Sequence, residues 1–568
     1  MKLQGHFFAT RINLITWLPI ILAMIVAAYM RFRTNSNLNY LLIGGDGPYY
    51  PLQIRSILEQ QKLAFPDMPL LFIFEGLIAG MLDFFHVASY NNCVLLAAKL
   101  TDAIIPPLAA IPVFLIVKEL NTPGITSRFL NYLLVYFALF NFTTSLVFSN
   151  GLQKNAVAVV WLFFYFYFVI RLIKYEQKKD LYYLGLVLLL CVLTHFGSFA
   201  LLIFFTALIG IFWLMYHKQA IRSFTWKKAA IILSALILFL LMIAYFDSGR
   251  FQRLISIPLK VFEFPVLLLM LSGYGIENFL SPLHLIVGNP LALIALISLI
   301  IYRKKISKEN KLIAWALVVA TFFLVSPFIG LEWANRLYIM SYIPIVVLYL
   351  ILFNSIKSKW LRIVPAGLFT LLIAMSIMGI RANTPCITQE SYTEFVQIQQ
   401  YVKFNENDAI IGRQDLRLLG SWEFRTKSIV DYLFKKEDFN RYHAVYVIRQ
   451  IKGSNFPSGR FRGDARIPDN SIKVYSGECF ELYQLKSGEG WKGGKGKPSK
   501  AHGKIISITP TQLVLQNDNG FMRTVELTDH TIIEMALKKG MSVEVWGNWK
   551  PFSLNVVAES IEELNNQN

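Results

Sequence analysis

Charge and cysteine are scarce in this 568-residue chain. Only 16% of its residues are charged, whereas a typical soluble protein has about 25%. The four cysteines have no metal-binding spacing, and only for Cys386 and Cys479 is disulfide pairing an open alternative. These shortages exclude an ordinary soluble globule, a cysteine-based metal centre and a disulfide framework.

Hydrophobic residues make up 55% of the chain, and the mean hydropathy is +0.48. Most of the chain must therefore use lipid as its solvent, and apolar runs of about 18 residues predict spanning helices. The run 181–216 is too long for one helix and is interrupted at 194–197, so it predicts a hairpin of two. We expect a polytopic α-helical membrane protein with about eleven transmembrane helices, at 12–30, 93–117, 129–147, 152–171, 181–216 (two), 229–246, 283–301, 312–330, 337–353 and 361–380.

Much of the net charge of +19 lies in lysine and arginine clusters between these runs. Such clusters stay on the cytoplasmic side of a membrane. They predict a multi-pass protein of the cell membrane with a cytoplasmic N-terminus, rather than a partner of nucleic acid. In this orientation 68–85 lies in or on the outer face without crossing, 258–282 is re-entrant or interfacial, and 12–30 is a signal anchor.

The tail after Arg381 is then extracytoplasmic. Residues 1–384 form the transmembrane domain, with the first outer loop at 31–92. Helical and strand-like stretches alternate in 385–486, with helices expected at 390–404 and 428–439, and they predict a small α/β domain. A Gly/Lys-rich linker, 487–502, leads to five short strand-like runs in 503–568, which predict an OB-like β-barrel.

Polar residues gather in the predicted outer loops. The first loop holds "GGDGPYY", in which Asp46 lies between glycines that let a substrate or cation approach closely. Basic side chains at outer helix ends can hold a phosphate. The candidate substrate-binding residues are Tyr50, Arg55, Lys154, His195, Glu332 and Arg336.

A structural role is an alternative for several of these residues. Asp46 is also a common turn residue, Lys154 can extend to lipid headgroups, and His195 can cap the hairpin. Glu332 and Arg336 are spaced to pair at i,i+4. Their combination favours a site with an acid and several cations on the outer face.

The stretch "DGPYYPLQIRSILEQQKLAFPDMPL" resembles the first outer loop of the GT-C superfamily of membrane glycosyltransferases. That superfamily includes oligosaccharyltransferase catalytic subunits, protein O-mannosyltransferases and aminoarabinose transferases. The segments "GLQKN" and "ANRLYIMSYIPIVVL" are similar to later GT-C segments. The resemblance implies that Asp46 is the catalytic carboxylate, as a base or as a metal ligand, and that Arg336 contacts the phosphate of a polyprenyl-phosphate sugar donor.

The chain departs from the oligosaccharyltransferase pattern at three points. Gly47 separates Asp46 from Pro48, no second Asp-x-Asp pair follows in a later outer loop, and the Trp-Trp-Asp signature is missing. The last departure argues against transfer to asparagine. A Mg²⁺ or Mn²⁺ ion at Asp46 would need further oxygen ligands, for which the candidates are Glu59, Asp67, Glu75 and Glu332.

The sequence therefore predicts a glycosyltransferase that moves a sugar to an extracytoplasmic protein, lipid or polysaccharide. A transporter or flippase of lipid-linked sugar is the alternative, but the predicted helices are poor in charge and no internal repeat is evident. Lys99 and Asp102 are the exception, and their i,i+3 spacing predicts that they satisfy each other. A third reading is a membrane-anchored binding protein; we expect the barrel to be a scaffold or an acceptor-docking module.

Overall fold

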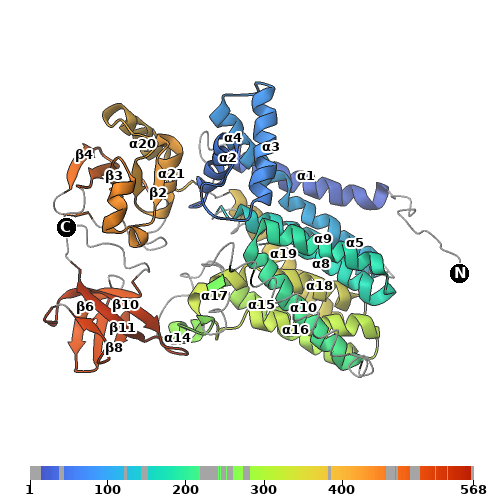
Figure 1. The fold of residues 1–568 in the computed structure, drawn as a ribbon. Coiled ribbons are helices and arrows are strands. Elements are labelled where there is room, and N and C mark those ends of the chain that lie inside the picture. Colours follow the sequence, from blue (N-terminus) through green and yellow to red (C-terminus); the bar gives the residue numbers. More distant parts are fainter. Residues whose placement is uncertain are drawn as a thin grey trace. The chain divides into compact units, whose positions relative to one another are not determined.

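The computed structural model describes residues 14–36, 42, 44–120, 125–141, 151–217, 241, 244, 251–252, 260–272, 282–381, 385–455, 467–468, 471–486, 499–517, 520–533 and 535–564. These residues belong to two compact units. The first unit comprises 1–218, 286–323 and 340–386, and the second comprises 219–285, 324–339 and 387–568. The first unit is helical, and both sheets belong to the second (Figure 1).

The helical unit follows the apolar pattern of the sequence. Its elements are α1 (Leu14–Ser36), α2 (Tyr49–Gln60), α3 (Leu70–Phe84), α4 (Tyr90–Ile104), η1 (Pro106–Ala109), α5 (Ala110–Glu119), α6 (Ile125–Leu139), α8 (Gln153–Tyr175), α9 (Lys178–Thr194), α10 (Phe196–Tyr216), α15 (Pro282–Tyr302), α16 (Lys308–Leu324), α18 (Tyr342–Phe353) and α19 (Trp360–Arg381). A helix occupies all or part of ten predicted spans; the eleventh, 229–246, lies outside the described residues except for 241 and 244.

Six helical segments of the described chain are long and apolar enough to cross a membrane. They are Thr16–Ser36, Tyr90–Glu119, Gln153–Tyr175, Phe196–Tyr216, Leu285–Tyr302 and Trp360–Gly379. Helices α9 and α16 have 17 residues each, and α6 has 15. The chain is a polytopic membrane protein, and a total of eleven spans stays a prediction.

Helix α18 lies at the centre of the helical unit. All twelve of its residues are buried; one is Pro344, and the other eleven are aliphatic or aromatic. The Tyr349 hydroxyl donates a hydrogen bond of 2.8 Å to the carbonyl of Leu291. A helix that is hydrophobic on every side belongs in a core, so α18 is the element around which its neighbours pack.

A buried ion pair corrects one prediction. Asp102 on α4 accepts hydrogen bonds from Arg31 at 2.7 Å and from Asn35 at 3.2 Å, both on α1. The expected pairing of Asp102 with Lys99 is wrong, because α1 packs against the face of α4 that carries the carboxylate. The deeply buried charge is thus matched by a guanidinium from a neighbouring helix.

The two ambiguous segments form short helices. Helix α3 has 15 residues, which rise about 22 Å and fall short of the roughly 30 Å thickness of the hydrocarbon core. Helix α14 (Val266–Leu271) has six residues. Neither is long enough to cross by itself, as the sequence predicts.

The second unit contains a five-stranded sheet in the order β2-β1-β3-β5-β4. The strands are β1 (Ala409–Ile411), β2 (Lys427–Ile429), β3 (Val445–Gln450), β4 (Ile472–Ser476) and β5 (Phe480–Gln484), with helices α20 (Gln389–Tyr401) and α21 (Gln414–Phe424). Strand β1 is parallel to β2 and β3, whereas β5 is antiparallel to β3 and β4. The helix expected at 428–439 is wrong: this segment contributes to β2 and then forms the 3-10 turns η3 (Asp431–Leu433) and η4 (Lys436–Arg441).

The last strands close into a barrel. Its strands are β6 (Ala501–Ile508), β7 (Gln512–Gln516), β8 (Met522–Glu526), β10 (Ser542–Trp549) and β11 (Val556–Glu563), and β9 (Ile532–Ile533) adds to β11. The order β10-β6-β7-β8-β11 is closed by pairing of β10 with β11. Alternate residues such as Leu513 and Leu515 fill the interior. This closed five-stranded arrangement confirms the small barrel predicted from the sequence.

Residues 260–265, here called the clamp segment, join the barrel to helix α17 (Leu331–Tyr338) within the second unit. The Gly330 N–H donates to Val261 O at 2.7 Å, and the Leu331 N–H donates to Phe264 O at 3.1 Å. On the barrel side, the rings of Phe264 and Trp549 lie 4.4 Å apart. The clamp segment therefore ties the first turn of α17 to the barrel.

Candidate functional site

Asp46 sits in a tight turn at the head of α2. The Gly47 N–H donates to Gly44 O at 3.1 Å, and the Tyr49 N–H donates to Asp46 O at 3.0 Å. Gly44 has a φ of +88°, a backbone conformation that residues with a Cβ rarely adopt. The glycine thus lets the chain turn sharply, and Asp46 stays partly exposed at the head of the helix.

The negative charge of Asp46 acts on two tyrosine hydroxyls. Burial raises the pKa of Tyr50 well above its usual value, and Asp46 is the next cause. Burial and then Asp67 raise the pKa of Tyr49, with a smaller contribution from Asp46. Both phenols stay protonated at neutral pH. The Tyr49 hydroxyl donates its proton to Asp67, whereas the Tyr50 hydroxyl accepts the Lys154 N–H and keeps its own proton as a donor.

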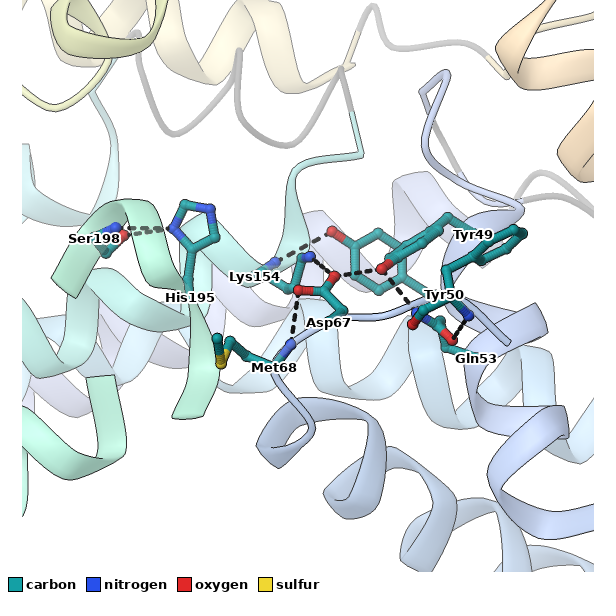
Figure 2. A network of polar contacts seen from close by, with 9 residues as sticks. Tyr49, Tyr50, Gln53, Asp67, Met68, Lys154, His195 and Ser198 are labelled. Atoms are coloured by element: carbon teal, nitrogen blue, oxygen red, sulfur yellow. Dashed lines mark hydrogen bonds and ion pairs between the residues drawn. The ribbon is translucent and has the colours of Figure 1, made fainter. Parts of the chain in front are cut away.

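Asp67 and Lys154 form an ion pair next to these tyrosines (Figure 2). The Tyr49 hydroxyl donates to the same carboxylate oxygen that binds the ammonium, and the Met68 N–H donates to the other oxygen at 2.8 Å. Burial raises the pKa of Asp67, but Lys154 and the hydrogen bonds outweigh it and lower the pKa overall. The carboxylate is therefore charged at neutral pH.

Gln53 holds the residues next to this ion pair in place. Its amide nitrogen donates to the Tyr49 hydroxyl at 2.8 Å and to Phe65 O at 3.0 Å, and its amide oxygen accepts the Phe65 N–H at 3.1 Å. One buried side chain on α2 thus fixes the segment that carries Asp67. The orientation of Asp67 is set before any ligand arrives.

Glu75 and Gln153 form a second contact beside the first. The Gln153 amide donates to Glu75 at 2.5 Å and to Ala98 O at 3.1 Å. Glu75 is fully buried, and within the described residues its second carboxylate oxygen has no hydrogen bond. Gln153 and Lys154 are adjacent at the start of α8, so this helix end binds two acidic residues of the segment 67–75.

The structure brings together three of the predicted residues. The Lys154 backbone N–H donates to the Tyr50 hydroxyl at 3.3 Å, which places Lys154 beside Tyr50 and the turn of Asp46. Arg55 is buried on α2. The ring of His195 hydrogen-bonds Ser198 and caps α10, as the structural alternative predicts (Figure 2).

Glu332 and Arg336 belong to the second unit, on α17. Their predicted i,i+4 pairing is confirmed at 3.9 Å, and the guanidinium lies 5.8 Å from the ring centroid of Trp333. The two side chains are 72% and 64% exposed. A site shared by Asp46 and Arg336 stays a prediction.

The carboxylates proposed as metal ligands are a poor set for Mg²⁺ or Mn²⁺. Asp67 is held by Lys154, Glu75 by Gln153 and Glu332 by Arg336. At about 4 Å and an effective dielectric of about 20, an ammonium repels a divalent cation by roughly 8 kcal/mol. Within the described part of the chain, no group of three or more His, Cys, Asp or Glu side chains is arranged to hold a metal ion. The residues present therefore do not fit an ion bridging Asp46 and Asp67.

The pairing of Asp67 with Lys154 and the contacts of Gln53 and Gln153 are not among the predictions from the sequence. The signal was the polar pair Gln153-Lys154 at the head of an otherwise apolar helix. The partners lie 87 and 78 residues away along the chain, so only the packed structure reveals them.

No family model matches the sequence, and no curated protein matches it. Among solved structures, the chain is similar to the apo form of the oligosaccharyltransferase of Archaeoglobus fulgidus, with 12% identity, a TM-score of 0.49, and coverage of 76% of this chain and 69% of that one. It is also similar to AglB of Archaeoglobus fulgidus in complex with an inhibitory peptide and a dolichol-phosphate, with 12% identity, a TM-score of 0.39, and coverage of 77% and 70%. At these values the likeness carries no information about substrate.

Proposed function

We propose that this protein is a membrane glycosyltransferase that moves a sugar from a polyprenyl-phosphate donor to an extracytoplasmic acceptor. The observation that carries the proposal is the juxtaposition of a partly exposed carboxylate, Asp46, with two protonated tyrosines and a fixed ammonium. The carboxylate can accept a proton while the ammonium and the Tyr50 phenol donate hydrogen bonds to an anion. Transfer from a lipid phosphate needs both kinds of group.

The reaction is a single displacement at the anomeric carbon. Asp46 accepts a proton from the acceptor nucleophile, which forms the new bond to the sugar. The bond from the anomeric carbon to the phosphate oxygen breaks, and its electron pair stays on the phosphate. Charge therefore accumulates on the departing lipid phosphate, where preorganised donors stabilise the transition state most.

Each of the other predicted residues has a role in this proposal. Lys154 and Arg336 bind the donor phosphate, Arg336 with a bidentate fork. Tyr50 and Arg55 help to bind the substrate beside Asp46, while His195 and Glu332 contact the sugar. The acceptor is a protein, lipid or polysaccharide on the non-cytoplasmic face, with the N-terminus cytoplasmic and the tail outside.

Asp46→Asn tests the catalytic role. The purified full-length protein is incubated with a panel of polyprenyl-phosphate sugars, and release of the free lipid phosphate is measured. We expect turnover by the wild type and at least a 100-fold loss in Asp46→Asn, the lower end for removal of a catalytic base. Asp83→Asn, in the same loop region on α3, is the matched control and keeps wild-type turnover.

A transporter is the second candidate, and one observation favours it. The helical unit buries the polar groups Arg31, Asp102 and Glu75, and buried ionisable groups in membrane helices often mark translocation pathways. Movement of a lipid-linked sugar across a vesicle membrane, with no release of lipid phosphate by any variant, would replace the proposed transfer with transport.

A further inference from the structure

We infer that Lys154 is the cation of this site, occupying the position beside Asp67 where a divalent metal ion would otherwise bind, so that transfer proceeds without a metal. The inference rests on the proposed function and specifies how the site handles the donor phosphate. It starts from the surroundings of the Lys154 side chain, which faces Asp67 and lies beside Tyr49 and Tyr50 (Figure 2).

Both the backbone N–H and the side-chain ammonium of Lys154 have partners. Its backbone N–H binds the Tyr50 hydroxyl, and its ammonium pairs with Asp67. The ammonium also lies 5.1 Å from the ring centroid of Tyr49 and 5.7 Å from that of Phe72, within the range of cation–π attraction. A cation held by a carboxylate and two aromatic faces is a built-in part of the site.

The carboxylate of Asp67 is already used by the protein. One oxygen accepts hydrogen bonds from Lys154 and Tyr49, and the other accepts the Met68 N–H. A metal ion at the carboxylate oxygen that faces Lys154 would have to displace the ammonium. Charge balance also favours the ammonium over a metal ion. One ammonium neutralises the single carboxylate of Asp67, whereas a divalent ion needs two carboxylates to be neutralised.

The ammonium keeps room for a ligand. Its side chain is 16% exposed, against 8% for Asp67, and an ammonium has three N–H donors. The N–H groups turned away from Asp67 can meet a phosphate oxygen. Lys154 thus connects the internal carboxylate to the leaving group, which is the bridging role that a metal ion would have.

Metal binding gives the direct test. Mn²⁺ is titrated into the full-length protein in detergent, and bound ion is measured by electron paramagnetic resonance. We expect no site that depends on Asp67 in the wild type, one such site in Lys154→Gln, and its loss in the double variant Lys154→Gln/Asp67→Asn. Lys154→Arg keeps the positive charge and serves as the matched control, with a titration like that of the wild type.

Two results would overturn the inference: a wild-type Mn²⁺ site that Asp67→Asn abolishes, or identical titrations in the wild type, Lys154→Gln and the double variant. Size-exclusion profiles and thermal unfolding show whether each variant is folded. If Lys154→Gln does not fold, the comparison of the wild type with Asp67→Asn still decides the inference.

Turnover separates this inference from the proposed function. The wild type should retain at least half of its donor turnover in excess EDTA and gain nothing from added Mn²⁺. Turnover that requires Mn²⁺ would refute the built-in cation and leave glycosyl transfer intact. A protein that turns over no donor under either condition would refute the proposed function, and the Mn²⁺ titrations would still decide the role of Lys154.

Discussion

Two ion pairs in this protein contrast in burial. Asp67 and Lys154 lie in the helical unit with side chains that are mostly buried, whereas Glu332 and Arg336 project from α17 and are mostly exposed. An exposed pair contributes about 0–1 kcal/mol to stability, but removing one partner of a buried pair costs about 3–5 kcal/mol. The first pair is therefore part of the architecture, and the second leaves its guanidinium available to a ligand.

Asp67→Asn should have the largest effect on stability, because it disrupts the buried ion pair. This change leaves the Lys154 ammonium in a mostly buried position without its counter-charge. We expect a loss of about 3 kcal/mol in the free energy of unfolding, the lower end of the range because Lys154 is partly exposed. Denaturant unfolding of the full-length protein in detergent measures it, and a loss below about 1 kcal/mol would contradict the structural role.

Acid should remove the same contribution more gradually. The pKa of Asp67 is lowered in the folded protein, despite the opposing effect of burial, because of Lys154. Its stabilisation is therefore present in full above the unfolded-state pKa of about 3.9 and is lost as the pH falls through the lower folded-state value. Unfolding midpoints of wild type and Asp67→Asn should converge below about pH 4. A constant difference between them at all pH values would assign the effect to another cause.

Arg336→Ala tests the exposed partner. Because we propose that Arg336 holds the donor phosphate, its removal should raise KM for the donor about tenfold, equivalent to about 1.4 kcal/mol, which is near the lower end for a hydrogen bond to a charged group. Steady-state kinetics with varied donor measure this change. Unfolding should shift by less than about 0.5 kcal/mol. An unchanged KM would remove Arg336 from the donor site.

Glu332→Gln should have the smallest effect on stability. It breaks the exposed pair with Arg336, which contributes about 0.3–0.5 kcal/mol at most and is screened by salt. Unfolding at low and high salt measures the difference. A loss as large as that of Asp67→Asn would show that α17 is buried against another surface in solution.

Local patterns explain what could be predicted from the sequence. The break at 194–197 separates α9 from α10, where His195 has an extended backbone and caps the second helix. Strand β7 lies in the predicted barrel segment 503–568, and burial alternates along it, with Leu513 and Leu515 inside the barrel. Helix length and strand alternation are properties of neighbouring residues.

Long-range pairing explains what was missed. Asp67 reads equally well as a metal ligand or as the partner of a lysine, and only the packing of α8 against the first loop decides between them. Asp102 likewise has a cation one turn away in Lys99, yet it binds Arg31 of another helix. Sequence spacing finds partners within one element, whereas the polar site is assembled between elements.

Gly330 gives the clamp segment a mechanical consequence. A Cβ at this position would collide with the carbonyl of Glu263, so only glycine fits between the clamp segment and the first turn of α17. Loss of the barrel would strip Phe262 and Phe264 of their aromatic partners Phe552 and Trp549 and release that anchorage. The barrel thus stabilises the start of α17, a helix more than 150 residues earlier in the chain. We expect its removal to destabilise the helix that carries Arg336.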